Sequence, residues 1–565
     1  MASDTVVVGR TAAGRMALVG LGDHSAASEV DTAALAAAVA ARENDGDVRW
    51  VWADTAAVYP RLLDAGVRVA RAWDLRLVHA ILHHARTVTD DHGLRSSTGW
   101  DADAAAPVDG DTLFDLGDAA SGIPETVEAA VAEYHRQTAA IASSEAPGAL
   151  RLLCAAESAG ALIAVELHTA GVPWSRAAHE HLLERELGAR RGGGLPARID
   201  QTAAVVRAAL DDPAASLDSQ PRLLRSLHRV GLMVQSTSRW ELAEHDHPAV
   251  APLIAYKKLM RLYTANGWAW LDEWVRDDRF RPVYVPAGVV TGRWASSGGG
   301  ALQIPRSLRT AVRADPGWTL VTADVAQLEP RVLAAMARDT ALAEAASGRD
   351  LYAGIVERGA VASRAEAKLA MLGAMYGATT GESGRLLPRL RRTFPRAMQL
   401  VDDAARTGED GGVVQTWLGR TSPAAGESWR ALQSLASDAA ASGVDETRAR
   451  RSARDRGRFT RNFVVQGTAA EWALAWLADL RARLAALPEV DATRAAPASG
   501  PVFQRRPHLA FFLHDEIVVH TPLEHADAVA DAVRESAASA GRLLFGTFPI
   551  DFPLDLRIGE TAEKG

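Results

Sequence analysis

The spacing of hydrophobic and polar positions changes along the chain and divides it into regions. Near the N-terminus, the apolar runs Thr5–Val8, Met16–Val19 and Val48–Trp52 have the length of strands and alternate with alanine-rich helical stretches. A polar segment at 88–123, rich in Asp and Gly, predicts a long loop. From about 150 to 285, apolar residues recur every three or four positions, which predicts helices. The first half of the chain therefore predicts an α/β region followed by a helical region.

The pattern changes again at Pro282–Pro305, which is too rich in glycine to be the interior of a helix or strand. The apolar run Trp318–Ala323 has the length of a strand, and a helical pattern follows it from about Leu328. Residues 340–480 predict further helices, with an interruption near Gly411–Gly426. This part of the chain therefore predicts a strand followed by a largely helical region.

The C-terminal part predicts a hairpin and a closing strand. His508–Leu513 and Ile517–His520 are strand-like runs separated by three polar residues. The last forty residues predict one helix and a strand at Pro549–Ile558. No segment repeats with a period of 20 to 50 residues, which excludes solenoids and propellers.

Composition narrows the class of protein. The 565 residues are 48% hydrophobic and 23% charged, which excludes a disordered chain, a collagen and a disulfide scaffold. At roughly 150 residues per domain, the length suggests three or four lobes. The single cysteine, Cys154, cannot form an internal disulfide, and neither a secretory signal nor an apolar window of about 18 residues without a charge is visible. We therefore expect a soluble, cytoplasmic protein with no membrane contact.

Arginine supplies nearly all of the positive charge. The formal net charge is −8, which argues weakly against a protein coated in nucleic acid. Only four of the 62 basic residues are lysines, namely Lys257, Lys258, Lys368 and Lys564. This bias is most simply an effect of genome composition. Where a lysine persists inside the fold, we expect that arginine is not an acceptable substitute.

Two aspartates follow predicted strands. Asp324 comes after Trp318–Ala323, and Asp515 lies in the turn of the predicted hairpin. Either one alone is also typical of a helix cap or a turn former. If the two strands are neighbours in one sheet, both carboxylates meet at one end, where their repulsion requires a cation. Oxygen ligands of this kind suit Mg²⁺.

Two helical patterns carry further polar side chains. Arg364, Lys368, Leu372 and Tyr376 are spaced four residues apart and share one face of a helix, although a solvated basic face would fit Arg364 equally well. A compact ammonium at Lys368 would suit a triphosphate. A second face carries Arg458, Asn462 and Gln466, whose side chains suit phosphates and base edges. The preceding arginine run, Arg448 to Arg456, is the strongest local candidate for phosphate contact in an acidic chain.

These residues resemble the family A DNA polymerases, the group of bacterial DNA polymerase I. Asp324 to Ala334 resembles the first palm motif of the family, Arg364 to Gly377 its fingers-helix motif, and Phe512 to Val518 its second palm motif. Thr291 to Arg293, Thr416 to Arg420 and Arg458 to Ala470 match further family segments in order. The resemblance covers roughly residues 220–565.

The resemblance implies a mixed α+β fold, a right-hand polymerase preceded by an RNase H-like α/β domain of the exonuclease type. The expected divisions are an exonuclease-like domain at 1–150 and a polymerase domain at 151–565, with the thumb at about 200–285, the palm at about 286–340 and 465–565, and the fingers at about 341–464. It also implies a monomer that is associated with the nucleoid and leaves no room for a separate 5′-nuclease domain.

The resemblance also implies residue roles in nucleotidyl transfer. Asp324, Asp515 and the backbone carbonyl of Val325 would bind two Mg²⁺ ions, for which Mn²⁺ can substitute, and Lys368 would act as general acid toward pyrophosphate. The residues implied for dNTP binding are Arg364, Lys368, Leu372, Tyr376, Gln327 and Glu329, with Glu329 excluding a 2′-hydroxyl. The residues implied for primer–template DNA are Thr291, Arg293, Arg458, Asn462, Gln466 and His514.

The sequence departs from the family pattern in the palm and fingers motifs. Leu372 stands where the family has an aromatic residue, and Val325 and Ala326 replace a tyrosine and a serine. We expect these changes to alter fidelity or rate rather than abolish the chemistry.

The N-terminal region lacks the expected exonuclease carboxylates. Arg71–Leu82 and Ala155–Ser175 resemble segments in and after the 3′-to-5′ exonuclease domain, whose activity needs four clustered carboxylates. The first strand has no Asp-x-Glu, Val58 falls at the position of the second-motif aspartate, and the acidic partner expected near Tyr134 is absent. We therefore expect a structural lobe without proofreading.

Three functions remain open. The first is a template-directed DNA polymerase without effective proofreading. The second is a single-subunit RNA polymerase, although Glu329 and Glu516 favour deoxynucleotides. The third is a catalytically weak DNA-binding scaffold, for which Asp324, Lys368 and Asp515 would not all be needed.

Overall fold

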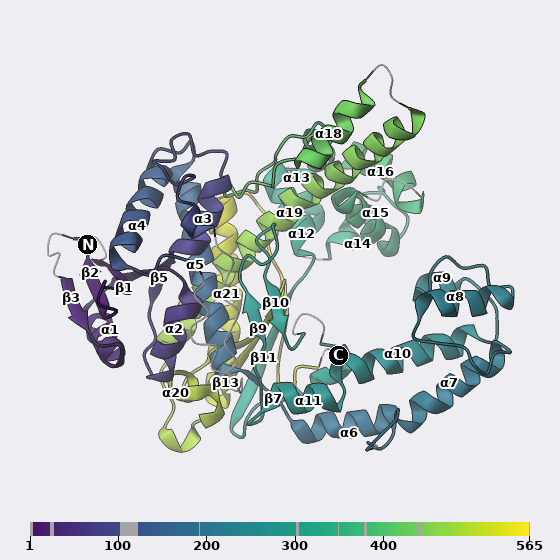
Figure 1. Ribbon diagram of the computed structural model, residues 1–565, viewed down its shortest axis with the longest axis horizontal. Coiled ribbons are helices and arrows are strands. Elements are labelled where there is room, and N and C mark those ends of the chain that lie inside the picture. Colours follow the sequence, from purple (N-terminus) through teal and green to yellow (C-terminus); the bar gives the residue numbers. More distant parts are fainter. Residues whose placement is uncertain are drawn as a thin grey trace. The chain divides into compact units, whose positions relative to one another are not determined.

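The computed structural model describes two compact units (Figure 1). The described residues are 4–22, 27–101, 122–190, 192–300, 304–348, 350–377, 381–438 and 442–563. The first unit comprises Met1–Gly171, Val283–Gly298 and Asp315–Gly559, and the second comprises Val172–Pro282, Gly299–Ala314 and Glu560–Gly565.

The N-terminal region of the first unit is built on a five-stranded sheet of order β3-β2-β1-β4-β5. The strands are β1 (Asp4–Arg10), β2 (Met16–Gly20), β3 (Ala27–Val30), β4 (Val48–Trp52) and β5 (Arg71–Asp74). β1, β2 and β3 are antiparallel neighbours, while β4 runs parallel to both β1 and β5. This is the RNase H-like arrangement expected from the resemblance, and the three strand-like runs predicted from the sequence lie in β1, β2 and β4.

Helices cover this sheet. They are α1 (Leu35–Asp45), α2 (Thr55–Asp64), α3 (Leu75–His84), α4 (Val127–Ala142) and α5 (Pro147–Ala170). Trp50 and Trp52 on β4 and Trp73 on β5 are fully buried. The predicted long loop at 88–123 is confirmed over 88–101, where the one regular element is the short turn η2 (Thr98–Trp100), and its remainder at 102–121 lies outside the described residues.

Helix α5 packs on β5 and α2 and also on two elements from later in the chain, β12 (His508–Leu513) and α19 (Gly443–Ala486). By length and composition it could cross a membrane, but 61% of its most apolar window is buried inside the protein. Two glutamates on α5 are buried in ion pairs, Glu157 with Arg420 and Glu166 with Arg481. The helix is therefore a core element shared by both regions, and the domain limit near residue 150 stays a prediction.

A second, four-stranded antiparallel sheet has the order β12-β13-β11-β14. Its strands are β11 (Trp318–Val325), β12 (His508–Leu513), β13 (Glu516–Pro522) and β14 (Leu554–Gly559), and α21 (Ala526–Phe545) packs on β11, β13 and β14. The predicted hairpin is confirmed. The predicted start of the closing strand at Pro549 is wrong, because Pro549 and Pro553 cannot donate to a sheet ladder and pairing begins at Leu554.

A helical region follows β11 in the chain. Its elements are α12 (Leu328–Ala337), α13 (Thr340–Ala346), α14 (Leu351–Glu357), α15 (Arg364–Tyr376), α16 (Gly381–Thr393), α17 (Pro395–Glu409), α18 (Glu427–Ala436) and α19 (Gly443–Ala486). α15 packs on α14 and α16 around a buried core that includes Met371, Leu390 and Phe394. The predicted interruption near 411–426 is confirmed, since no helix occupies those described residues.

The second unit is mainly helical. It contains α6 (Arg176–Leu187), α7 (Ala197–Ala209), α8 (Gln220–Arg229), α9 (Arg239–Ala243), α10 (Val250–Asn266) and α11 (Trp268–Trp274). α7 and α10 lie side by side (Figure 1). The short strands β6 (Val172–Pro173), β7 (Val275–Arg276) and β8 (Arg279–Phe280) form a small sheet, against which Trp174, Trp270 and Phe280 cluster. The prediction that residues 150–285 are mostly helical is therefore confirmed.

Candidate active site

The register of the four-stranded sheet brings Asp324 and Asp515 together. Asp324 on β11 pairs with Glu516 on β13, and the backbone N–H of Val325 donates to the carbonyl oxygen of Asp515 at 2.9 Å. Asp515 lies in the two-residue turn between β12 and β13, whose other residue, His514, has a φ of +57°. Both carboxylates therefore lie at one end of the sheet, as their positions after two strands predict.

The charges at this end of the sheet are poorly balanced. Burial and the nearby charge of Asp324 together raise the pKa of the Asp515 carboxyl to about 7, although Arg293 partly offsets both effects. Burial and the charge of Arg293 lower the pKa of His514 to about 4, so this ring is neutral at neutral pH. Two neighbouring half-buried carboxylates, of which Asp515 has a raised pKa, form a site at which a cation is stabilised.

A hydrogen-bonded trio joins three elements beside the aspartates. Glu329 in the first turn of α12 accepts hydrogen bonds from Arg293, which follows β9 (Val283–Val285), and from Tyr376, the last residue of α15. The Tyr376 hydroxyl lies 2.6 Å from Glu329 Oε2. Burial and the charge of Glu329 raise the pKa of Tyr376, so the phenol stays protonated and acts as the donor.

A cavity of about 250 Å³ opens beside this trio. Its lining includes the predicted residues Arg293, Gln327, Glu329, Leu372, Tyr376, His514 and Asp515. Trp294, Tyr352 and Phe512 add aromatic walls that the sequence reasoning did not single out. The cavity therefore gathers residues from the fingers helix and from the two palm motifs, which themselves lie nearly 200 positions apart in the sequence.

Asp350 was not among the predicted site residues. Its carboxylate contacts two residues that were predicted to bind the nucleotide. Its carboxylate accepts from Arg364 Nη2 at 2.7 Å and from Gln327 Nε2 at 3.3 Å. Gln327 has a left-handed backbone conformation at the start of α12, and its side-chain oxygen accepts from the N–H of Leu351 at 3.3 Å. The signal for Asp350 was present in the sequence, because an aspartate before an apolar helical pattern is a typical N-cap.

The predicted face of α15 exists, and its members lie in different environments. Arg364 is paired with Asp350, Lys368 is exposed, and Leu372 is half-buried against the helical core. Ser363 caps the helix by accepting from the N–H of Glu366, so α15 begins at Arg364, the first predicted cation. Lys368 thus projects from the middle of a rigid helix.

The second predicted face lies on α19. The Gln466 side-chain oxygen accepts from the Thr291 hydroxyl at 3.1 Å, Asn462 is half-buried, and Arg458 is exposed beside Asp455. Gly377 ends α15 with a φ of +75°, and a Cβ there would lie 2.5 Å from Cγ of Arg458. A glycine at this position therefore lets the end of α15 approach the Arg458 stem closely.

The basic stretch on α19 divides into exposed and structural arginines. Arg448, Arg450, Arg451 and Arg454 are exposed. Arg456 donates to the carbonyls of Gly412 and Pro423 at 3.0 Å, and the buried Arg461 donates to Ala374 O and to Asp402. Arg461 therefore has a structural role, because its guanidinium joins the carbonyl end of α15 to α17.

The N-terminal sheet uses its nearby carboxylates for helix capping. Asp54 caps α2 and pairs with Arg76, while Asp74 caps α3 and accepts from Thr55. Val58 on α2 packs on the apolar core, and Tyr134 on α4 packs edge-on against Trp73. The residues at the predicted exonuclease positions therefore serve packing.

An antiparallel sheet with two carboxylates at one end, continued by a helical subdomain and preceded by an RNase H-like sheet, defines a right-hand polymerase fold. A model of DNA polymerase family A matches residues 227–563, more than half of the chain, and the chain belongs to this family.

Similar proteins agree with this assignment. DNA polymerase I of Chloroflexus aurantiacus is 28% identical over 354 residues, which cover 58% of this chain and 34% of that protein. The thermostable DNA polymerase I of Thermus aquaticus is 25% identical over 362 residues, covering 59% and 38%. The chain thus matches less than two fifths of the length of these relatives.

A solved structure shares the fold. The POL domain of Pol1 from M. smegmatis, in complex with DNA primer-template and dNTP, aligns with a TM-score of 0.67 and 18% identity, covering 99% of this chain and 95% of that one. At this identity the likeness concerns the fold.

Proposed function

We propose that this chain is a template-directed DNA polymerase that adds dNTPs to a primer 3′-hydroxyl. The observation that carries the proposal is the convergence of Asp324 and Asp515 beside a cavity lined by Glu329 and Tyr376. Family membership supports the same reaction class. Primer–template DNA and dNTPs would be its partners, and we propose a monomer in the cytoplasm at the nucleoid.

The site fits Mg²⁺. Asp324 and Asp515 offer carboxylate oxygens, and the raised pKa of Asp515 reflects its burial and the charge of Asp324, both of which a cation would offset. We propose that these two residues and the Val325 carbonyl hold two ions. When bound, such ions polarise the primer hydroxyl and neutralise charge on the pyrophosphate leaving group.

The chain's own residues would bind and orient the substrates. Arg364 and Lys368 would hold the triphosphate, for which Arg364 must exchange Asp350 for a phosphate oxygen. Lys368, as a proton donor, would protonate the pyrophosphate. Thr291, Arg458, Asn462, Gln466 and His514 would contact the DNA backbone and minor groove, where acceptors common to all base pairs allow binding without sequence preference.

The Glu329–Tyr376 hydrogen bond would shape the sugar pocket. Because Arg293 and Tyr376 both hold Glu329, the carboxylate is positioned against movement toward solvent. A fixed carboxylate beside the sugar would exclude a 2′-hydroxyl by contact and would favour deoxynucleotides.

Primer extension with Mg²⁺ tests the proposal. We expect extension with dNTPs and much less with rNTPs, and a loss of at least about 10³-fold in rate for Asp515→Asn, the scale of removing one preorganised catalytic group. The matched control is Asp531→Asn on α21, an exposed aspartate paired with Arg534, which should keep the full rate. A preference for rNTPs would favour an RNA polymerase, and DNA binding with no extension would favour a scaffold.

The absence of proofreading is a separate proposal. A purified sample should leave a mismatched primer intact in Mg²⁺ or Mn²⁺ without dNTPs. Degradation that persists in Asp515→Asn would show that the N-terminal region is an active exonuclease.

A further inference from the structure

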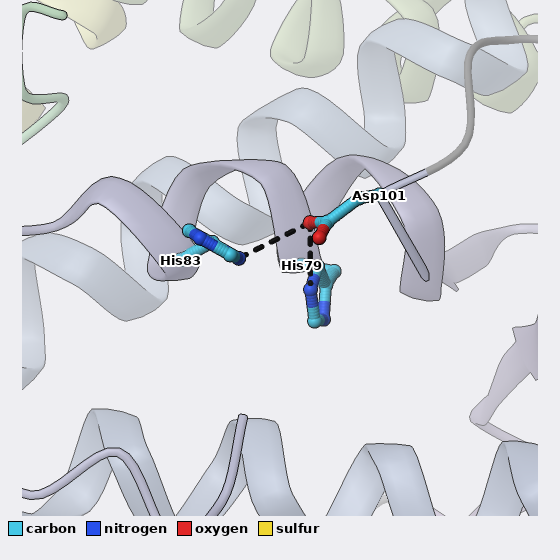
Figure 2. Close-up of side chains that lie close together, drawn as sticks. All are labelled: His79, His83 and Asp101. Atoms are coloured by element: carbon cyan, nitrogen blue, oxygen red, sulfur yellow. Dashed lines mark ion pairs between the residues drawn. The ribbon is translucent and has the colours of Figure 1, made fainter. Parts of the chain in front are cut away.

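Two histidines on α3 converge on one carboxylate in the N-terminal region, well apart in the sequence from the palm motifs. His79 Nε2 lies 3.3 Å from Asp101 Oδ1, and His83 Nδ1 lies 3.1 Å from the same oxygen. Figure 2 shows both imidazoles pointing toward that oxygen, with Asp101 coming from the segment after η2. The facing nitrogens of both histidines have no hydrogen-bond partner among the described residues.

A second carboxylate holds His79 from behind. Glu133 on α4 is fully buried, and its Oε1 lies 2.7 Å from His79 Nδ1. Gln137 and Arg136 also donate to Glu133, at 2.8 and 2.9 Å, and hold its carboxylate in place. His79 therefore donates through Nδ1, which leaves its Nε2 lone pair directed at the oxygen of Asp101.

This arrangement requires a positive charge between His79 and Asp101. His79 is fully buried, and a neutral imidazole would place a lone pair against a carboxylate oxygen. Either a second proton on the ring or a bound cation removes that conflict. A carboxylate that holds a histidine through its outer nitrogen, as Glu133 does, is the usual outer partner of a metal-binding histidine.

The spacing of the ligand atoms favours the cation. Tetrahedral bonds of 2.0–2.1 Å place neighbouring ligand atoms about 3.3 Å apart, close to both measured distances. All three ligand atoms lie within 4.8 Å of one another, so a modest turn of the His83 ring completes the site. Asp101 is 41% exposed and His83 is 25% exposed, which leaves an entry path for an ion.

We propose that His79, His83 and Asp101 form a binding site for a divalent transition-metal ion of the Zn²⁺ class. Two imidazoles and a carboxylate suit Zn²⁺ better than Mg²⁺, which prefers oxygen ligands. Three protein ligands leave the fourth position to water. The site ties α3 to the segment after η2, and it does not depend on the function proposed for the palm.

Metal titration of the full chain tests this site. Chelator-treated protein is titrated with Zn²⁺ by calorimetry and with Co²⁺ by visible absorption, in millimolar Mg²⁺ to occupy the palm carboxylates. We expect one equivalent bound and a higher melting temperature. His83→Ala and Asp101→Asn should each weaken binding by at least about 100-fold, because loss of an outer partner alone costs 10–100-fold.

The matched control is His92→Ala, an exposed histidine 3.7 Å from Asp90, which should bind the metal as the parent does. If His83→Ala does not fold, Asp101→Asn alone tests the site. The Asp101 side chain is partly exposed, and an asparagine keeps its shape. The proposal is overturned if the parent binds no Zn²⁺ at micromolar concentration at pH 8. It is equally overturned if both ligand variants bind as tightly as the parent.

Discussion

At the scale of single residues, the cavity depends on how Glu329 is held. Its two carboxylate oxygens accept from Arg293 and Tyr376, which come from different parts of the chain. The palm motif predicted Glu329 and the fingers motif predicted Tyr376, but their hydrogen bond could not be predicted, because it depends on where α15 ends relative to α12. The same holds for Asp350, which is typical of a helix cap in the sequence and is the partner of Arg364 in the structure.

Removal of the Glu329 carboxylate should weaken sugar selection. We expect Glu329→Ala to raise rNTP incorporation relative to dNTP incorporation by at least about tenfold, because it opens the space that a 2′-hydroxyl would need. Single-nucleotide kinetics with each substrate measure this ratio. Tyr376→Phe removes one of the two hydrogen bonds to Glu329 and should raise the ratio less than Glu329→Ala, because Arg293 still holds the carboxylate. An unchanged ratio in Glu329→Ala would contradict the proposed role.

At the scale of elements, the approach of α15 to α19 depends on Gly377. Its φ of +75° is strained for other residues, and an added Cβ would meet Arg458. The spacing of Arg364, Lys368 and Tyr376 predicted the helix and its exposed face, since a period of 3.6 can be seen in one segment. The sequence did not show which arginines of α19 would be buried, because Arg461 acquires its partners from α15 and α17.

Gly377→Ala should therefore strain the backbone and also displace the Arg458 side chain. We expect a loss of about 1–2 kcal/mol in unfolding free energy, together with weaker binding of primer–template DNA as Arg458 is displaced. Gly359→Ala is the matched control, because Gly359 has a φ of +71° and open space around its Cβ position. Denaturant unfolding and DNA titration separate the two effects. Equal DNA affinity in both variants would exclude a role for Arg458 in DNA binding.

A buried glutamate, Glu471, lies where α19 packs against the segment Thr416–Arg420. Glu471 accepts from the Thr416 hydroxyl and from the N–H of Leu418, and burial raises its pKa to about 7. An acid whose pKa is raised on folding binds more protons in the native state than in the unfolded state. Its contribution to stability therefore falls as pH rises from about 4 toward 7.

Comparison of Glu471→Gln with the parent should show how this carboxyl makes stability depend on pH. We expect the melting temperature of Glu471→Gln to rise relative to that of the parent as pH increases from 5 to 8. The reason is that the parent then carries a buried charge, which the variant lacks. Melting curves at several pH values measure the difference. A difference that is flat across this range would mean that Glu471 is ionised in the fold at pH 5.

At the scale of the whole molecule, α5 joins the RNase H-like region to the palm region within the first unit. Glu166 on α5 accepts from Arg481 of α19 and from Arg68, and Tyr59 of α2 donates to it at 2.6 Å. Although burial opposes ionisation, Arg481 and Arg68 lower the pKa of Glu166 to about 2. Buried charges therefore connect the N-terminal region to the palm region.

Removal of the buried Glu166 carboxylate should destabilise the protein strongly. Glu166→Ala leaves Arg481 buried without its partner, and we expect a loss of about 3–5 kcal/mol in unfolding free energy. The exposed ion pair of Glu125 with Arg10 is the control, where Glu125→Ala should cost less than about 1 kcal/mol. Urea unfolding compares the two, and a small effect at Glu166 would mean that the two regions are stable separately.

The sequence by itself determined the family, the type of most elements and the carboxylates at the two strand ends. These features are local, because periodicity, strand length and motif spacing can be read within one segment. Tertiary structure alone decided which side chains meet: Asp324 with Asp515 through sheet register, Arg364 with Asp350, and His79 and His83 with Asp101. The physical reason is that hydrogen bonds and ion pairs act over a few ångströms, whereas the residues that make them lie 14 to nearly 200 positions apart in the chain.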